Sequence, residues 1–328
     1  MKHDVKITIL LIFLFVLTQF IGLYVVNHYS PVRVVQGGQI QNVTAPKLPY
    51  GMETPKIEKE SDYKIFFYGV LISFMFAVLV LFLLTKFNLG IVLKIWFLIV
   101  ITLALGIFLY AVIPAFKYSA IVAVAIALPL AFIKMFKRNF FIHNITELVV
   151  YPGISAVFVP ILNFWTVIVL LILISIYDMW AVWQSGIMQK MAKYQINTLN
   201  IFTGFFIPYA PGKLKLKEKL RMLKEKVKGK MKKVKMNIAI LGGGDIIFPI
   251  IASGVILKTG AKYLPFGLPP FIGGFMPAIF AIGGAALGLG SLLVLSQKKK
   301  FYPAMPFITG GIFIGIILSY LVSVLFLY

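Results

Sequence analysis

The sequence predicts an all-α polytopic membrane protein with nine transmembrane helices. Of its 328 residues, 60% are hydrophobic and only 13% are charged, and the mean hydropathy is +0.96. Apolar runs of about 20 residues, long enough to cross a bilayer as helices, recur along the chain. Length alone would suggest about two soluble domains, but so few charged residues cannot cover a water-exposed surface.

The predicted spans are apolar runs bounded by polar or basic segments. The first, Ile7–Val26, is too long for the apolar core of a signal peptide and lacks a small-residue cleavage site, so we expect a retained helix. A polar stretch with several prolines and glycines, Asn27–Lys64, follows as an expected loop. The later spans are expected at Ile65–Leu84, Ile91–Ala115, Tyr118–Phe136, Ile145–Val159, Ile161–Trp183, Asn237–Leu257, Ile272–Leu295 and Pro303–Tyr328.

The basic residues predict the orientation. We expect one membrane-embedded domain over residues 1–328, in which a long loop, 184–236, separates six helices in 1–183 from three in 237–328. Nine crossings place the N-terminus and loop 184–236 on the same side, and that side carries 23 of the 32 Lys and Arg residues. Because basic loops stay in the cytoplasm, we expect this side to be cytoplasmic and the C-terminus to be external.

Residues 213–235 are predicted to form a basic amphipathic helix. The segment has twelve Lys and Arg against two acids, and its apolar residues recur at steps of three and four. A basic helix next to membrane spans fits the anionic inner leaflet, so we expect that surface as its partner. Nucleic acid is not expected, because no aromatic residues interleave the basic ones and the orientation rule already explains the charge.

The composition also excludes several kinds of site. Without cysteine, the chain has no disulfide, no thiolate metal site and no cysteine nucleophile. Its three histidines, His3, His28 and His143, form no His-Glu-x-x-His pattern, so a zinc protease is not expected. We therefore expect neither a metal nor a cofactor.

Only two of the ten acidic residues lie deep inside apolar spans. Seven others lie in polar or basic segments. Glu147, three residues after Asn144, matches a capping box at a helix start, and the adjacent His143 is expected to be solvated. The remaining two are Asp178 and Asp245, and an aspartate near the centre of a membrane helix costs about 2.5–3.5 kcal/mol to insert. Such residues normally face the protein interior and have a role.

The two aspartates are predicted to lie at a similar depth. Asp178 precedes the cytoplasmic end of its span by five residues, and Asp245 follows the cytoplasmic start of its span by eight. At about 1.5 Å per residue these depths are about 7 Å and 12 Å, so the carboxyls meet if the helices are neighbours. Two carboxyls in contact share one proton, which leaves a base and an acid that together activate water against a peptide carbonyl.

The residues around the aspartates suit such a site. Asp245 follows three glycines, which weaken a helix and let another backbone come close: Gly242, Gly243 and Gly244. Tyr177 precedes Asp178 and adds a polar group to an apolar site. The last span opens with two prolines that keep the chain extended and leave amide groups for an extended substrate, in the segment Pro303, Ala304, Met305 and Pro306.

In this order, Tyr177-Asp178, Gly242-x-Gly244-Asp245 and Pro303-Ala304 resemble the motifs of the presenilin and signal peptide peptidase family of GxGD intramembrane aspartyl proteases. The nine spans and the long sixth loop match as well, so the resemblance covers essentially the whole chain and looks most like the compact archaeal and microbial members. It implies a presenilin-like fold, a catalytic dyad of Asp178 and Asp245, and an active-site segment beginning at Pro303 that engages transmembrane-helix substrates.

The resemblance also bears on specificity and partners. Met305 stands where the family has leucine, a swap of similar volume that bears on substrate preference. The orientation is presenilin-like, whereas signal peptide peptidases are inverted. Presenilin works with partner subunits and signal peptide peptidases act alone. Nothing in this sequence requires a partner subunit, and a homo-oligomer is compatible with it.

Two other activities use similar residues. A proton- or cation-coupled transporter also places carboxylates on broken membrane helices. A prepilin-type GxGD peptidase cleaves nearer the membrane surface, but the Tyr-Asp and Pro-Ala motifs and the nine spans argue against it.

Two further features lie outside the motifs. Gly284-x-x-x-Gly288 and Gly311-x-x-x-Gly315 are expected to be helix-packing faces. The apolar segment Ile201–Tyr209 is a candidate to re-enter the membrane and cover the aspartates.

Overall fold

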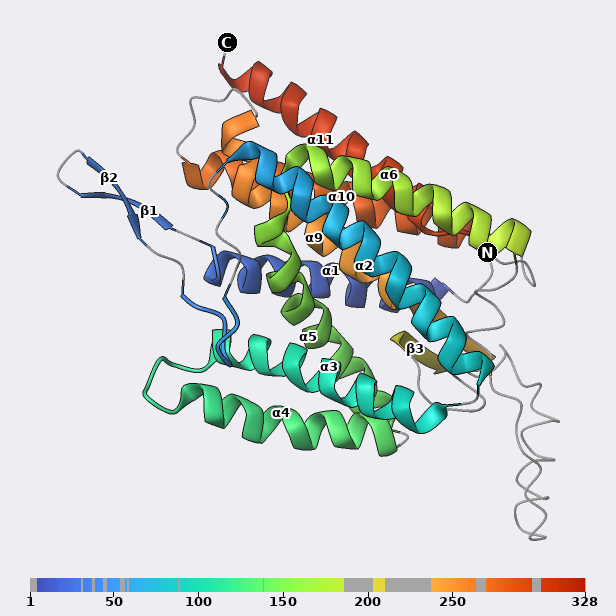
Figure 1. Cartoon of the computed structure of the whole chain (residues 1–328). Coiled ribbons are helices and arrows are strands. Elements are labelled where there is room, and N and C mark those ends of the chain that lie inside the picture. Colours follow the sequence, from blue (N-terminus) through green and yellow to red (C-terminus); the bar gives the residue numbers. More distant parts are fainter. Residues whose placement is uncertain are drawn as a thin grey trace, which may run out of the picture.

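The computed structural model describes residues 5–30, 32–36, 39–43, 46–53, 57, 59–87, 89–137, 139–185, 203–209, 237–263, 270–296 and 302–327. Within these ranges the chain is a bundle of nine α-helices with two small antiparallel sheets (Figure 1). Eight helical segments among them are long and apolar enough to cross a membrane, and α9 is the ninth helix. The predicted class, an all-α polytopic membrane protein, is confirmed.

The helices follow the predicted spans in order. They are α1 (Val5–His28), α2 (Glu60–Lys86), α3 (Gly90–Val112), α4 (Ser119–Phe136), α5 (Phe140–Phe158), α6 (Phe164–Trp180), α9 (Gly243–Tyr263), α10 (Pro270–Leu295) and α11 (Met305–Leu327). A short 3-10 turn, Val159–Ile161, joins α5 to α6, and a π-helical turn, Ala181–Ser185, extends α6. The predicted basic helix at 213–235 lies outside the described residues, and the division into 1–183, 184–236 and 237–328 stays a prediction.

One predicted helix begins as a strand. Asn237–Leu257 was expected to be helical throughout, but its first six residues form β4 (Asn237–Gly242), and α9 begins only at Gly243. Burial alternates along β4, with Ala239 and Leu241 buried and Ile240 exposed, which is the period of a strand. β4 pairs with β3 (Gly204–Tyr209), so most of the segment proposed as re-entrant is a strand beside the start of α9.

The polar stretch Asn27–Lys64 is more ordered than the expected loop. It contains a hairpin of β1 (Val32–Gln36) and β2 (Gln39–Val43), which extends away from the helices (Figure 1). Its last residues already belong to α2, which begins at Glu60. The Asp62 carboxylate accepts a hydrogen bond from the Lys59 N–H at 3.0 Å and so satisfies a backbone donor at this helix end.

The predicted start of the fifth span is wrong by more than one turn. α5 begins at Phe140, and its N-cap is Asn139, whose side chain accepts hydrogen bonds from the N–H groups of Phe141 and Ile142. Asn144 and Glu147 therefore lie inside the helix, and the predicted capping box does not exist. The helix extends backwards because an apolar run and a good cap precede the residues that the pattern had selected.

The buried core lies between α1, α5, α6, α9, α10 and α11. α10 and α11 approach closely through glycine: a Cβ on Gly284 would collide with the Gly311 carbonyl, and one on Gly315 would collide with the Phe280 carbonyl. The predicted packing faces are thus confirmed. α2 is apolar, yet Phe67 is its one buried residue, as expected for a helix that faces lipid. α1 begins at the end of the bundle where β3 lies, and α11 ends at the opposite end (Figure 1).

Candidate active site

Asp178 lies in the last turn of α6 and is 7% exposed. Its Oδ2 accepts a hydrogen bond from the Met305 N–H at 3.0 Å, and the Ala304 N–H also donates to this carboxylate. Both donors lie at the start of α11, where the first N–H groups of a helix have no partner within the helix. The N-terminus of α11 therefore holds the Asp178 carboxyl group.

Asp245 lies in the first turn of α9 and is half-buried. The Gly242 N–H, at the end of β4, donates a hydrogen bond to its carboxylate. The two aspartate carboxyls interact electrostatically, and α6 packs against α9. Residues 67 positions apart in the sequence thus form one acidic pair, held by backbone N–H groups on both sides.

A side chain added at any of the three glycines before Asp245 would meet other side chains, while the backbone of Gly242 pairs with Gly204 of β3. A Cβ on Gly242 would lie 3.2 Å from Asp245 Oδ2, and one on Gly243 would lie 2.6 Å from the Tyr151 hydroxyl oxygen of α5. Around Gly244 the nearest atom is at 3.8 Å, an ordinary contact. Tyr151 is 5% exposed and fills the space that the missing side chain of Gly243 leaves.

The other predicted site residues differ in how deeply they are buried. Pro303, Ala304 and Met305 are buried, while Pro306 is half-buried. Tyr177 is 37% exposed, and its ring packs edge-on against Phe74 of α2, with ring centroids 5.8 Å apart. The segment predicted to engage substrate therefore contacts Asp178 through its own backbone.

Gln19 was not among the predicted site residues. This side chain of α1 is fully buried, and its Nε2 donates a hydrogen bond to the carbonyl of Ile246, the residue after Asp245, at 3.1 Å. α1 thereby holds the first turn of α9 at the residue after Asp245, whereas β4 lies before Asp245 in the sequence. A polar amide within an otherwise apolar span was the signal that could have found it.

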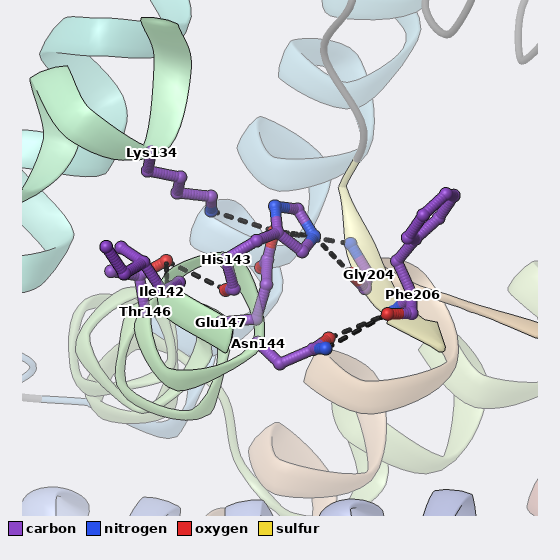
Figure 2. A network of polar contacts seen from close by, with 8 residues as sticks. All are labelled: Lys134, Ile142, His143, Asn144, Thr146, Glu147, Gly204 and Phe206. Atoms are coloured by element: carbon purple, nitrogen blue, oxygen red, sulfur yellow. Dashed lines mark hydrogen bonds and ion pairs between the residues drawn. The ribbon is translucent and has the colours of Figure 1, made fainter. Parts of the chain in front are cut away.

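The expectations for two residues of α5 were wrong. His143 was expected to be solvated and Glu147 to cap a helix, yet their side chains are only 15% and 1% exposed, and Lys134 of α4, beside them, is 4% exposed. Lys134 Nζ lies 2.8 Å from Glu147 Oε1, and Figure 2 shows this pair next to β3. Basic and acidic residues at span ends can be buried against a strand that the sequence pattern did not predict.

Among the described residues, no group of three or more His, Cys, Asp or Glu side chains could hold a metal ion. At the acidic pair, one carboxyl can accept a proton from water while the other donates one.

The comparisons with known proteins fit this arrangement. The family model described as signal-peptide peptidase, presenilin aspartyl protease matches residues 42–327. The chain belongs to this family. It is accordingly an integral multi-pass membrane protein and an intramembrane aspartyl protease, which favours the protease over the transporter. No curated protein matches the chain.

Two solved structures have a similar fold. Both are of a presenilin family intramembrane aspartate protease, one in the C222 and one in the P2 space group. The first is 15% identical with a TM-score of 0.53, and the alignment covers 94% of each chain. The second is 17% identical with a TM-score of 0.53 and covers 95% of this chain and 97% of the other. The predicted presenilin-like fold is confirmed.

Proposed function

We propose that this intramembrane aspartyl protease cleaves transmembrane helices of membrane proteins or signal peptides, with Asp178 and Asp245 as its catalytic dyad. The observation that supports this most is the pairing of the two carboxyls, each held by backbone N–H groups from a different segment. Two neighbouring carboxylates repel each other, so a mechanism in which one carboxyl keeps its proton and serves as the acid suits this pair.

The reaction needs only this pair and water. The deprotonated carboxyl takes a proton from water, whose oxygen bonds to the peptide carbonyl carbon, while the protonated carboxyl donates its proton to the carbonyl oxygen. A tetrahedral intermediate results. Proton transfer to its nitrogen then breaks the C–N bond and releases one product with a new carboxyl group and one with a new amine.

The substrate must unwind before it reacts. In a helix each backbone N–H and C=O is already paired, and inside a membrane the freed groups need new partners. Pro303, Ala304, Met305 and Pro306, together with the two-stranded sheet that leads into Asp245, are the proposed contacts for this extended stretch. Tyr177 and the glycines Gly242, Gly243 and Gly244 support the site around the dyad.

A cleavage assay tests the dyad. Purified protein in detergent is incubated with a single-span peptide, and products are identified by mass. Asp178→Ala and Asp245→Ala should each lower the rate by at least about 100-fold, because acid–base groups contribute factors of this size. Glu53→Ala removes an exposed carboxylate and should cleave like the wild type. Wild-type activity in either aspartate variant contradicts the assignment, and proton-coupled uptake into liposomes without cleavage would favour the transporter.

The proposed orientation has the N-terminus and loop 184–236 in the cytoplasm and the C-terminus outside, with the basic segment 213–235 on the anionic inner surface. The absence of cysteine lets a single introduced thiol report the side. In intact cells, a membrane-impermeant maleimide should label Lys47→Cys, between α1 and α2, but not Lys137→Cys, between α4 and α5. The reverse labelling contradicts this orientation.

A further inference from the structure

β3 has two edges, and they contact different parts of the molecule. One edge pairs with β4. The other faces α5, whose side chains contact the backbone of Gly204 and Phe206 (Figure 2). Because the backbone groups of a strand alternate between its edges, these two residues present the N–H and C=O groups that a further strand would use.

Three side chains of α5 take the place of that strand. Asn144 donates from Nδ2 to the Phe206 carbonyl at 3.0 Å and accepts at Oδ1 from the Phe206 N–H at 3.0 Å. His143 donates from Nε2 to the Gly204 carbonyl at 2.8 Å, which requires the hydrogen on Nε2 because a carbonyl only accepts. Glu147 Oε1 accepts from the Gly204 N–H at 3.4 Å. We call these three residues the α5 edge.

The α5 edge includes a buried charge, and α4 compensates it. The Glu147 side chain is 1% exposed, and its Oε1 lies 2.8 Å from Lys134 Nζ and 3.7 Å from His143 Nε2. An uncompensated carboxylate at this depth would be costly. Lys134 therefore pairs with the same Glu147 oxygen that accepts from the backbone of β3.

The α5 edge is linked to Asp245 through the sheet. Gly204 lies directly opposite Gly242 in the register of β3 and β4, and the Gly242 N–H donates to the Asp245 carboxylate. Gly204 has φ +125°, and a Cβ there would collide with the Leu241 carbonyl, so the close approach of the two strands depends on glycine. A shift of β3 at this point would move the residues that hold Asp245.

We propose that Asn144, His143 and Glu147 are positioning residues, which occupy the outer edge of β3 and thereby fix the register of the β3–β4 sheet relative to Asp245. This inference rests on the proposed function, because it concerns which peptide bond of a substrate reaches the dyad. An occupied edge also prevents an extended peptide from pairing with β3.

Hydrogen exchange tests the contact without any cleavage. In an Asp178→Ala background, Asn144→Leu removes both bonds to Phe206 while it keeps the approximate side-chain volume. The peptide covering 203–209 should then exchange at least about tenfold faster, because an amide loses its acceptor. Thr146→Val is the matched control: Thr146 is buried on the same helix, but its hydroxyl bonds to carbonyls of α5 itself. In Thr146→Val, the peptide covering 203–209 should exchange at the rate of the parent.

Product analysis tests the positioning role. With the aspartates intact, Asn144→Leu should change the ratio of products cut at neighbouring bonds by at least about twofold, since a looser sheet presents the substrate in more than one register. Thr146→Val should change at most the total rate. If Asn144→Leu does not fold, Asn144→Ser, which is too short to reach β3, replaces it in both assays.

The outcomes separate the two proposals. Unchanged exchange at 203–209 in a folded Asn144 variant overturns the α5 edge. Faster exchange with an unchanged product ratio overturns its positioning role. If the wild type cleaves no transmembrane peptide, the proposed function fails, while the exchange measurement still decides whether the α5 edge holds β3.

Discussion

Lys134 and Glu147 form an ion pair that is almost completely removed from solvent, with side chains 4% and 1% exposed and a separation of 2.8 Å between Nζ and Oε1. At an effective dielectric constant of about 20, two unit charges at this distance attract by about 6 kcal/mol. Burial of the two charges costs several kcal/mol each, so the net contribution of the pair is small. Removal of one charge, however, leaves the other buried without compensation.

We therefore predict a large loss of stability in each single variant, and in the double variant a loss much smaller than the two single losses added together. Lys134→Met and Glu147→Gln should each destabilise the protein by about 3–5 kcal/mol, because each leaves an unpaired buried charge. The double variant should lose much less than the sum, since no buried charge remains. At about 2–4 °C per kcal/mol, each single variant should lower the Tm by at least about 6 °C.

Thermal unfolding in detergent, followed by tryptophan fluorescence, measures these shifts. The exposed pair Lys47 and Glu53 is a matched control, with side chains 84% and 73% exposed and 3.5 Å apart. Neutralising either residue should change stability by about 1 kcal/mol or less, because solvent screens exposed pairs. Single variants of the buried pair as stable as these controls, or a double variant equal to the sum of the singles, would refute the reasoning.

Three further predictions concern close backbone contacts. Gly284→Ala should destabilise the protein by about 1–3 kcal/mol through overpacking against α11, whereas Gly283→Ala, which meets nothing within 4 Å, should not; thermal unfolding compares them. Met305→Pro removes the N–H that donates to Asp178, at a helix position where proline fits. Cleavage should slow by about 10- to 100-fold, because a hydrogen bond to a charged group contributes about 1.5–3 kcal/mol. An unchanged cleavage rate contradicts this. Gly204→Ala should strain the backbone by about 1–3 kcal/mol and speed exchange in 203–209; parental exchange and Tm would show that β3 tolerates a side chain.

The candidate site could be predicted in part because charges are rare in this chain. Asp178 and Asp245 were conspicuous within apolar spans, and the motif order pointed to one family. What the sequence did not show is how the carboxyls are held. The donor from Met305 comes from a helix start 127 residues away from Asp178, and no local pattern encodes such a contact.

The α5 residues illustrate a different limit. Asn144 and Glu147 matched a local capping pattern, and that interpretation was wrong because a better cap at Asn139 lay upstream. Their actual partner is β3, about 60 residues later in the chain, inside a segment predicted to be apolar and re-entrant. A strand of six residues in a helical membrane protein gives only a weak periodic signal.

The sequence by itself determined that this chain is a membrane protein, roughly where its helices run and which two carboxyls are exceptional, because hydropathy and the cost of burying charge are local properties. Only the tertiary structure decided that span seven begins as a strand, that Lys134 and Glu147 are buried, and that backbone N–H groups of β4 and α11 hold the aspartates. These features depend on which distant segment lies beside each residue, and that is settled by packing of the whole bundle.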